Sequence, residues 1–442
     1  MRSILVSLAS LIGSSFFVQF SNAAVITLVA IIIAENGGTS SDVAVVAAAY
    51  SLGFIAGCFL APPQIYRIGL VRGYAAAAGI MTIAVVALEI LDGIAALTVL
   101  RFLMGASFAA VMAIADSWIN DKAPAEQRGR ILAVYSVFLG LASILSQVFF
   151  LTMDSREDGF ILTFAITMNL AVVLVALGTT KQPKLGETVP RYFRPLSFVS
   201  GPATVAAFAS GFCTTSMISI LPFYLSEHGT HEDLVALVVG TLYLGRLLCQ
   251  WPLGMLSDRL ERRTLLLAIS VVVIATLLVT VPFDGGQGQN VSGHRGVVVQ
   301  GLSFLLLFIM GGALYPMYSV AAALAFDRAE GRPLMDISTT ILIVHSLGAI
   351  LGPLVVMVLG FFLGDYALHA GIILACGAVA ITCITGKATR PAAESPTPAV
   401  KVISTDSLDM AEAAAEIVEE KLAEEEPDEP SEARAENAVN EE

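Results

Sequence analysis

Twelve long apolar stretches, separated by short polar segments, dominate this 442-residue chain. A transmembrane α-helix needs about 20 mostly apolar residues to cross a hydrocarbon core about 30 Å thick. The sequence shows none of the alternating apolar and polar strands that a β-barrel requires. The sequence therefore predicts an all-α membrane protein with twelve transmembrane helices. The stretches are 4–34, 43–62, 73–90, 94–116, 129–153, 160–180, 202–226, 234–256, 265–282, 298–324, 336–362 and 367–385.

Composition supports a membrane protein. Charged residues make up 14% of the chain and the mean hydropathy is +0.80, whereas soluble proteins carry about 25% charged residues. The net charge of −13 comes mainly from 386–442, which holds 16 acidic and 5 basic side chains. Because the rest of the chain is nearly neutral, no nucleic-acid partner is expected. We expect 386–442 to be a mostly disordered acidic tail, although the apolar spacing between Leu408 and Leu422 also suits a short amphipathic helix.

The distribution of basic residues predicts the orientation in the membrane. Loops on one side carry only Arg156 and Arg295, and the side that holds the N-terminus carries many more. By the positive-inside rule the richer side is cytoplasmic, which predicts an inner-membrane protein with both termini in the cytoplasm. The basic residues of that side are Arg2, Arg67, Arg72, Lys122, Arg128, Arg130, Lys181, Lys184, Arg191, Arg194, Arg259, Arg262, Arg263, Arg328 and Arg332.

One basic segment with three prolines, 181–201, is the longest connection on the cytoplasmic side. It separates an N-terminal bundle, 1–180, from a C-terminal bundle, 202–385, with six apolar stretches in each. A division into two six-helix halves is typical of transporters built from parallel repeats. We expect a monomer surrounded by lipid.

A charged motif follows the stretch 234–256 and reads Gly254-Met-Leu-Ser-Asp258-Arg259-Leu-Glu-Arg262-Arg263. Glycine lets two helices approach closely, and an aspartate at a helix end can pair with an arginine of the next helix. Such charges at the water boundary can form and break contacts at modest cost. At the corresponding place after the stretch 43–62, Pro62 replaces the glycine and Tyr66 replaces the aspartate. The motif is therefore intact only in the second half of the chain.

This motif is similar to the loop signature G-x-L-x-D-R-x-x-R-R of the major facilitator superfamily, and Arg101 with Gly105 resembles its R-x-x-x-G signature. The segments 62–75, 115–136, 245–263 and 311–328 resemble the YcaD-like transporters. The resemblance covers 1–385 and implies two six-helix bundles around a central solute cavity. Asp116 stands where typical members have glutamate. Candidate gating residues are Gly254, Asp258, Arg259, Arg262, Arg263, Asp116, Arg72 and Arg128.

The resemblance implies that the first, fourth, seventh and tenth stretches line the cavity, with help from the second, fifth, eighth and eleventh. Polar residues are concentrated in these stretches. Arg246 is the sharpest of them, because Tyr243 and Gln250 share its helical face. It contacts an anionic or carbonyl-rich solute, or it is a structural arginine bonded to carbonyl groups of neighbouring helices. The substrate-binding candidates are Gln19, Asn22, Arg101, Gln147, Thr215, Tyr243, Arg246, Gln250 and Tyr318.

Proton coupling has two candidates, Glu35 and His345. Histidine titrates near neutral pH, but a lone histidine in this place also suits a packed neutral side chain. No residue pattern indicates a metal, a cofactor or a catalytic group, so we do not expect an enzyme.

The sequence predicts a secondary active transporter for a small organic solute, with a riboflavin-like vitamin or a small carboxylate as the specific guesses. The resemblance associates a Gly-Pro run in the fifth span with export. This run is missing from 129–153, which favours uptake, although Gly352-Pro353 occurs in 336–362. The alternatives are an exporter of drugs or metabolites, and a membrane sensor or scaffold that signals through the acidic tail.

Overall fold

The computed structural model describes residues 2–122, 128–178 (except 154, 156 and 158), 200–284, 294–328 and 334–385. These residues form twelve α-helices and one short 3-10 turn. In lipid, a helix satisfies every backbone hydrogen bond within its own segment. The elements are α1 (Arg2–Glu35), α2 (Ser40–Ile68), α3 (Leu70–Ile90), α4 (Ile94–Lys122), α5 (Arg128–Phe149), α6 (Phe160–Leu177), α7 (Gly201–Glu227), α8 (Glu232–Arg259), α9 (Arg262–Asp284), α10 (His294–Asp327), α11 (Leu334–Leu363), η1 (Gly364–Tyr366) and α12 (Ala367–Thr385).

The helices coincide with the predicted apolar stretches. Eleven apolar segments of the described residues are long enough to cross a membrane, and the last of them, Thr340–Thr385, contains most of α11 and all of α12. The prediction of an all-α protein with twelve transmembrane helices is confirmed. Several predicted ends differ from the structure. For example, α5 stops at Phe149 and a turn follows it, whereas the predicted stretch reached residue 153. Most of the predicted linker and all of the predicted tail lie outside the described residues.

The connection between α2 and α3 differs from the prediction. The apolar stretch was expected to end at residue 62, but α2 continues through Pro62 and Pro63 to Ile68. Neighbouring helices can compensate for the hydrogen bonds that prolines lose within a membrane. Gly69 alone then joins the two helices, with a φ of 85° and its amide donating to the carbonyl of Ile65 at 2.8 Å. Glycine suits this position because a side chain disfavours positive φ.

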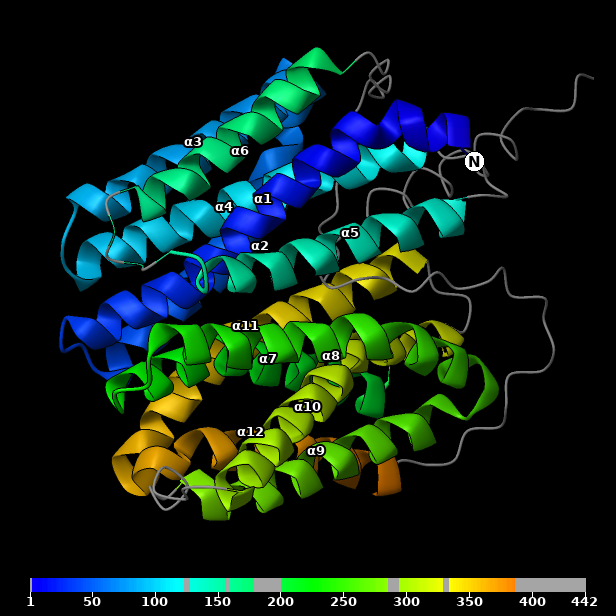
Figure 1. Ribbon diagram of the computed structural model, residues 1–442. Coiled ribbons are helices and arrows are strands. Elements are labelled where there is room, and N and C mark those ends of the chain that lie inside the picture. Colours follow the sequence, from blue (N-terminus) through cyan, green and yellow to red (C-terminus); the bar gives the residue numbers. More distant parts are fainter. Residues whose placement is uncertain are drawn as a thin grey trace, which may run out of the picture.

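Two bundles of six helices are arranged one above the other (Figure 1). In the first bundle α1 packs on α5 and α6, α2 on α4, and α3 on α4 and α6. In the second bundle α7 packs on α11 and α12, α8 on α10, and α9 on α10 and α12. Each pair of the first set becomes a pair of the second when six is added to its labels. The bundles are therefore structural repeats of each other, and helices six apart are called counterparts below.

The bundles meet along a seam formed by α2 with α11, α5 with α8, and α1 with α7. The hydroxyl of Ser51 in α2 donates to the carbonyl of Ala349 in α11 at 3.4 Å. The backbone amide of Ser155, just after α5, donates to the carboxylate of Glu232 at the start of α8 at 3.0 Å. We call the side on which α1 begins the N face. Because successive helices reverse direction, the first contact lies near mid-height and the second lies at the opposite face.

Candidate functional site

A buried arginine of the first bundle stacks on a tyrosine beside the seam. Arg101 of α4 is only 4% exposed. Its guanidinium carbon lies 4.3 Å from the ring centroid of Tyr50 in α2, a cation–π geometry. The hydroxyl of Tyr50 donates to Oδ1 of Asn22 in α1 at 3.1 Å. Arg101 is thus placed by two neighbouring helices, and the residue after Tyr50 makes the Ser51 contact across the seam.

The second bundle has a similar arginine–tyrosine pair. Arg246 of α8 is 8% exposed, and its guanidinium carbon lies 5.0 Å from the ring centroid of Tyr315 in α10. The ring of Tyr243, one helical turn before Arg246, lies 6.2 Å from that of Tyr315. Tyr243 and Tyr315 pack in a small cluster with Ala23 of α1. Ala23 directly follows Asn22, which binds Tyr50, so consecutive residues of α1 contact both pairs and the pairs adjoin across the seam.

Close helix crossings bring each pair together. A β-carbon at Gly105 of α4 would overlap the carbonyl oxygen of Tyr50 in α2. A β-carbon at Gly245 of α8 would likewise overlap the carbonyl oxygen of Phe308 in α10. Small residues allow membrane helices to approach in this way. The helices α2 and α4 are the counterparts of α8 and α10, so the two pairs occupy equivalent crossings with arginine and tyrosine exchanged between the helices.

Two amide candidates form contacts within the first bundle. The amide nitrogen of Gln19 donates to Oγ of Ser143 in α5 at 2.9 Å. The side chain of Gln147 accepts from Oγ1 of Thr27 at 3.0 Å and donates to the carbonyl of Ala23 at 3.3 Å. Both side chains therefore join α1 to α5. Oε1 of Gln19 is buried and has no hydrogen-bond partner among the described residues.

The remaining binding and coupling candidates are Thr215, Gln250, Tyr318, Glu35 and His345. Thr215 and Gln250 are partly buried. Tyr318 is buried and meets His345 of α11 edge-on, with 4.7 Å between ring centroids. Glu35 is exposed at the end of α1. Tyr50 and Tyr315 were not among the predicted candidates, and their positions opposite the arginines identify them.

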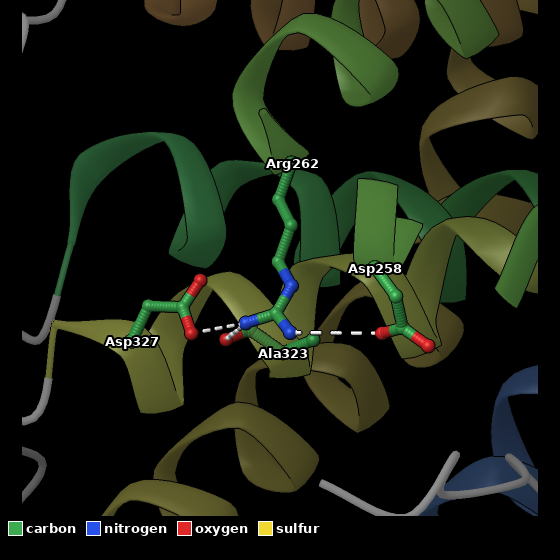
Figure 2. Close-up of polar contacts among 4 residues, drawn as sticks. All are labelled: Asp258, Arg262, Ala323 and Asp327. Carbon is green, nitrogen blue, oxygen red and sulfur yellow. Dashed lines mark hydrogen bonds and ion pairs between the residues drawn. The ribbon is translucent and has the colours of Figure 1, made fainter. Parts of the chain in front are cut away.

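A second polar cluster lies at the N face, where Arg262 begins α9. Figure 2 shows its guanidinium between the carboxylates of Asp258 in α8 and Asp327 in α10. Nη1 forms an ion pair with Asp327 and donates to the carbonyl of Ala323 at 2.9 Å, and Nη2 lies 4.0 Å from Asp258. The cluster ties α8, α9 and α10 together. Asp327 was not predicted, although it lies in the segment 311–328 that carries the resemblance.

The other predicted gating residues are dispersed. Arg263 donates to the carbonyls of Cys383 and Ile384, so it caps the end of α12. Arg72 and Arg259 are exposed, and Gly254 is partly buried. Asp116 is fully buried in α4 and faces the hydroxyl of Tyr135 in α5. The side chain of Arg128 lies outside the described part of the chain. Of the predicted gating side chains that the structure describes, Asp258 and Arg262 form an ion pair.

Comparisons with known proteins agree on the fold. The family model described as the Major Facilitator Superfamily matches residues 11–231 and 203–418. The chain is 26% identical over 330 residues to the MFS-type transporter YcaD of Escherichia coli O139:H28, covering 74% of this chain and 82% of that protein.

Two solved structures share the architecture. The nucleoside transporter NupG aligns with a TM-score of 0.63 and 11% identity, covering 86% of this chain and 98% of that one. A bacterial homologue of the human lysosomal transporter Spinster, in an inward-facing and unoccupied conformation, aligns with a TM-score of 0.59 and 16% identity. Its alignment covers 87% of this chain and 94% of that one.

Proposed function

Because the chain belongs to the Major Facilitator Superfamily, we propose that it is a secondary active transporter that takes up a small organic solute by alternating access. In this mechanism, a solute site between two repeats is exposed to one side of the membrane at a time. The observation that carries the proposal is the adjoining pair of buried arginine–tyrosine contacts. Charged side chains within a membrane commonly mark the pathway of a solute or ion, and Arg101 and Arg246 come from different bundles.

We place the N face in the cytoplasm and the protein in the inner membrane. Exposed or partly buried basic side chains at this face include Arg67, Arg72, Lys122, Arg259 and Arg263. An excess of Lys and Arg is the usual mark of the cytoplasmic side.

In this proposal the structure represents the inward-facing state. The bonds from Ser51 to Ala349 and from Ser155 to Glu232 join the bundles at mid-height and at the external face. Among the described helices, α4 and its counterpart α10 share no extensive contact. Opening toward the outside requires the contacts at the external face to break. The Arg262 cluster keeps the cytoplasmic ends of α8, α9 and α10 together during that movement.

Uptake is the favoured direction because α5 lacks the Gly-Pro run that the resemblance associates with export. Export is the second candidate, since Gly352-Pro353 lies in α11, the counterpart of α5. A β-carbon at Gly348 of α11 would overlap the carbonyl of Phe208 in α7, so the glycines of this run also serve helix packing.

The proposal is tested by measuring solutes in the growth medium. Cells that produce the wild-type chain are compared with cells that produce Arg101→Met and with cells that produce Gly79→Ala. Gly79 is the control because a β-carbon there meets no other atom within 4 Å. We expect faster depletion of at least one small organic solute with the wild type and with Gly79→Ala only. Accumulation of a solute in the medium of the wild-type cells would establish export. Identical solute levels in the media of wild-type and Arg101→Met cells would contradict transport.

A further inference from the structure

The buried charges of the described residues do not balance. They are Arg101, Arg246 and Asp116. Asp116 lies 15 residues beyond Arg101 in α4, which corresponds to about 22 Å along the helix axis. It faces Tyr135. The single buried carboxylate is therefore remote from Arg101 and leaves that guanidinium without a nearby negative charge.

The imbalance of buried charge is clearest at Arg101. Its Nη1 donates to the sulfur of Met104 at 3.8 Å, which is a weak contact, and its guanidinium stacks on Tyr50. No carboxylate of the described residues forms an ion pair or a hydrogen bond with it. A guanidinium has five N–H donors, and a buried charge is costly unless it is paired and hydrogen-bonded. Further N–H donors of this guanidinium are therefore available to hydrogen-bond a ligand.

The aromatic rings beside the two arginines supply a second recognition element. Tyr50 stacks on Arg101, and Tyr315 stacks on Arg246. Tyr243 contacts Tyr315 and packs with Ala23, the residue after Asn22, whose side chain binds Tyr50. A planar guanidinium fork matches a carboxylate, which it can bind through two parallel hydrogen bonds. Tyrosine faces and edges match a flat apolar ring.

We propose that the solute is an aromatic or heteroaromatic carboxylate, bound by Arg101 and Arg246 through its carboxylate and by Tyr50, Tyr243 and Tyr315 through its ring. This inference rests on the proposed transport function. One arginine comes from each bundle, so a bound carboxylate links the bundles at the seam and supplies the missing negative charge.

The test uses the purified full-length chain in lipid nanodiscs and follows its thermal unfolding with three probes. Benzoate and benzamide have nearly the same shape but differ in charge, and inorganic phosphate is an anion without a ring. Benzoate at about ten times its dissociation constant raises the unfolding midpoint by about 2 °C or more. Benzamide and phosphate leave it unchanged. Equal stabilisation by benzamide overturns the charge requirement, and stabilisation by phosphate alone overturns the ring requirement.

Variants separate recognition from a purely structural role. Arg101→Met and Arg246→Met weaken benzoate binding about 10- to 150-fold, and the lysine variants retain part of it. Without ligand, Arg101→Met unfolds at the same or a higher temperature than the wild type, because an unbalanced charge has been removed. The exposed Arg67→Met is the control and keeps the full benzoate response. A lower midpoint for Arg101→Met together with unchanged benzoate affinity overturns the inference.

The medium measurement separates this inference from the proposed function. Depletion of neutral or cationic solutes alone leaves uptake intact and overturns the carboxylate assignment. If benzoate does not stabilise the wild type, the carboxylate assignment is likewise overturned, and the proposed uptake function is unaffected. Depletion of an aromatic carboxylate that ceases with Arg101→Met supports both.

Discussion

Gln147 was expected to contact the solute, yet its amide binds Thr27 and Ala23 of α1. We predict that Gln147→Leu lowers the free energy of unfolding by about 1–2 kcal/mol and leaves transport per folded molecule unchanged. Thermal unfolding and transport normalised to folded protein are the measurements. Thr27→Val provides the comparison, because it removes one of the same hydrogen bonds from the other side. Loss of transport by Gln147→Leu with an unchanged free energy of unfolding would instead indicate that Gln147 contacts the solute.

Two carboxylates face Arg262, and they are not equivalent. The side chain of Asp258 is 76% exposed, that of Asp327 is 39% exposed, and that of Arg262 is 15% exposed. We predict that Asp258→Asn costs about 0–1 kcal/mol, as exposed ion pairs do. Asp327→Asn costs about 1–2 kcal/mol, because the less exposed partner of a largely buried guanidinium is lost. Transport falls in the same order. A larger loss of transport with Asp258→Asn would restore the motif aspartate as the main partner.

Individual residues differ in how far the sequence identifies them. Arg101 and Arg246 could be singled out because a charge within an apolar helix is rare and costly. Gln19 and Gln147 looked equally suited to a solute, but the rotation of α1 against α5 decides what their amides bind. Tyr50 could not be chosen in advance, since only the crossing of α2 with α4 places it on Arg101.

Helix packing depends on glycines at a few crossings. We predict that Gly105→Ala destabilises the protein by about 1–3 kcal/mol through overpacking and weakens binding by separating α4 from α2. Gly79→Ala in α3 is the matched control. Its β-carbon meets open space, and alanine favours helix by about 1 kcal/mol over glycine. The measurements are the unfolding midpoint and benzoate affinity of each variant. Similar effects at both positions would contradict the role of the crossing.

The positions of the helices could be predicted from the length of apolar sequence, because the membrane thickness sets that length. Their ends follow local rules less closely. Proline normally stops a helix, yet α2 passes Pro62 and Pro63 and ends at Ile68, just before Gly69. Whether a helix continues past a proline depends on the neighbouring helices that pack around it. The positions of those helices cannot be read from a single sequence.

For the whole molecule, alternating access requires the bundles to separate at the external face. We predict that a disulfide between Ser155→Cys and Glu232→Cys stops transport, and that a reductant restores it. The variants are made in a background without the five native cysteines. Thr39→Cys with Asp42→Cys is the control, because this hydrogen-bonded pair lies within one bundle. Full transport by the cross-linked Ser155–Glu232 protein would show that this contact does not open.

The unbalanced buried charge also has an electrical consequence. Among the described residues, the buried side chains of Arg101, Arg246 and Asp116 carry a net charge of +1. A membrane potential does work of about 2.3 kcal/mol per elementary charge for each 100 mV. If a monoanion cancels this charge, voltage acts on the empty carrier and hardly on the loaded one. An inside-negative potential then holds the empty carrier inward-facing, so its return to the outside becomes the voltage-sensitive step of the cycle.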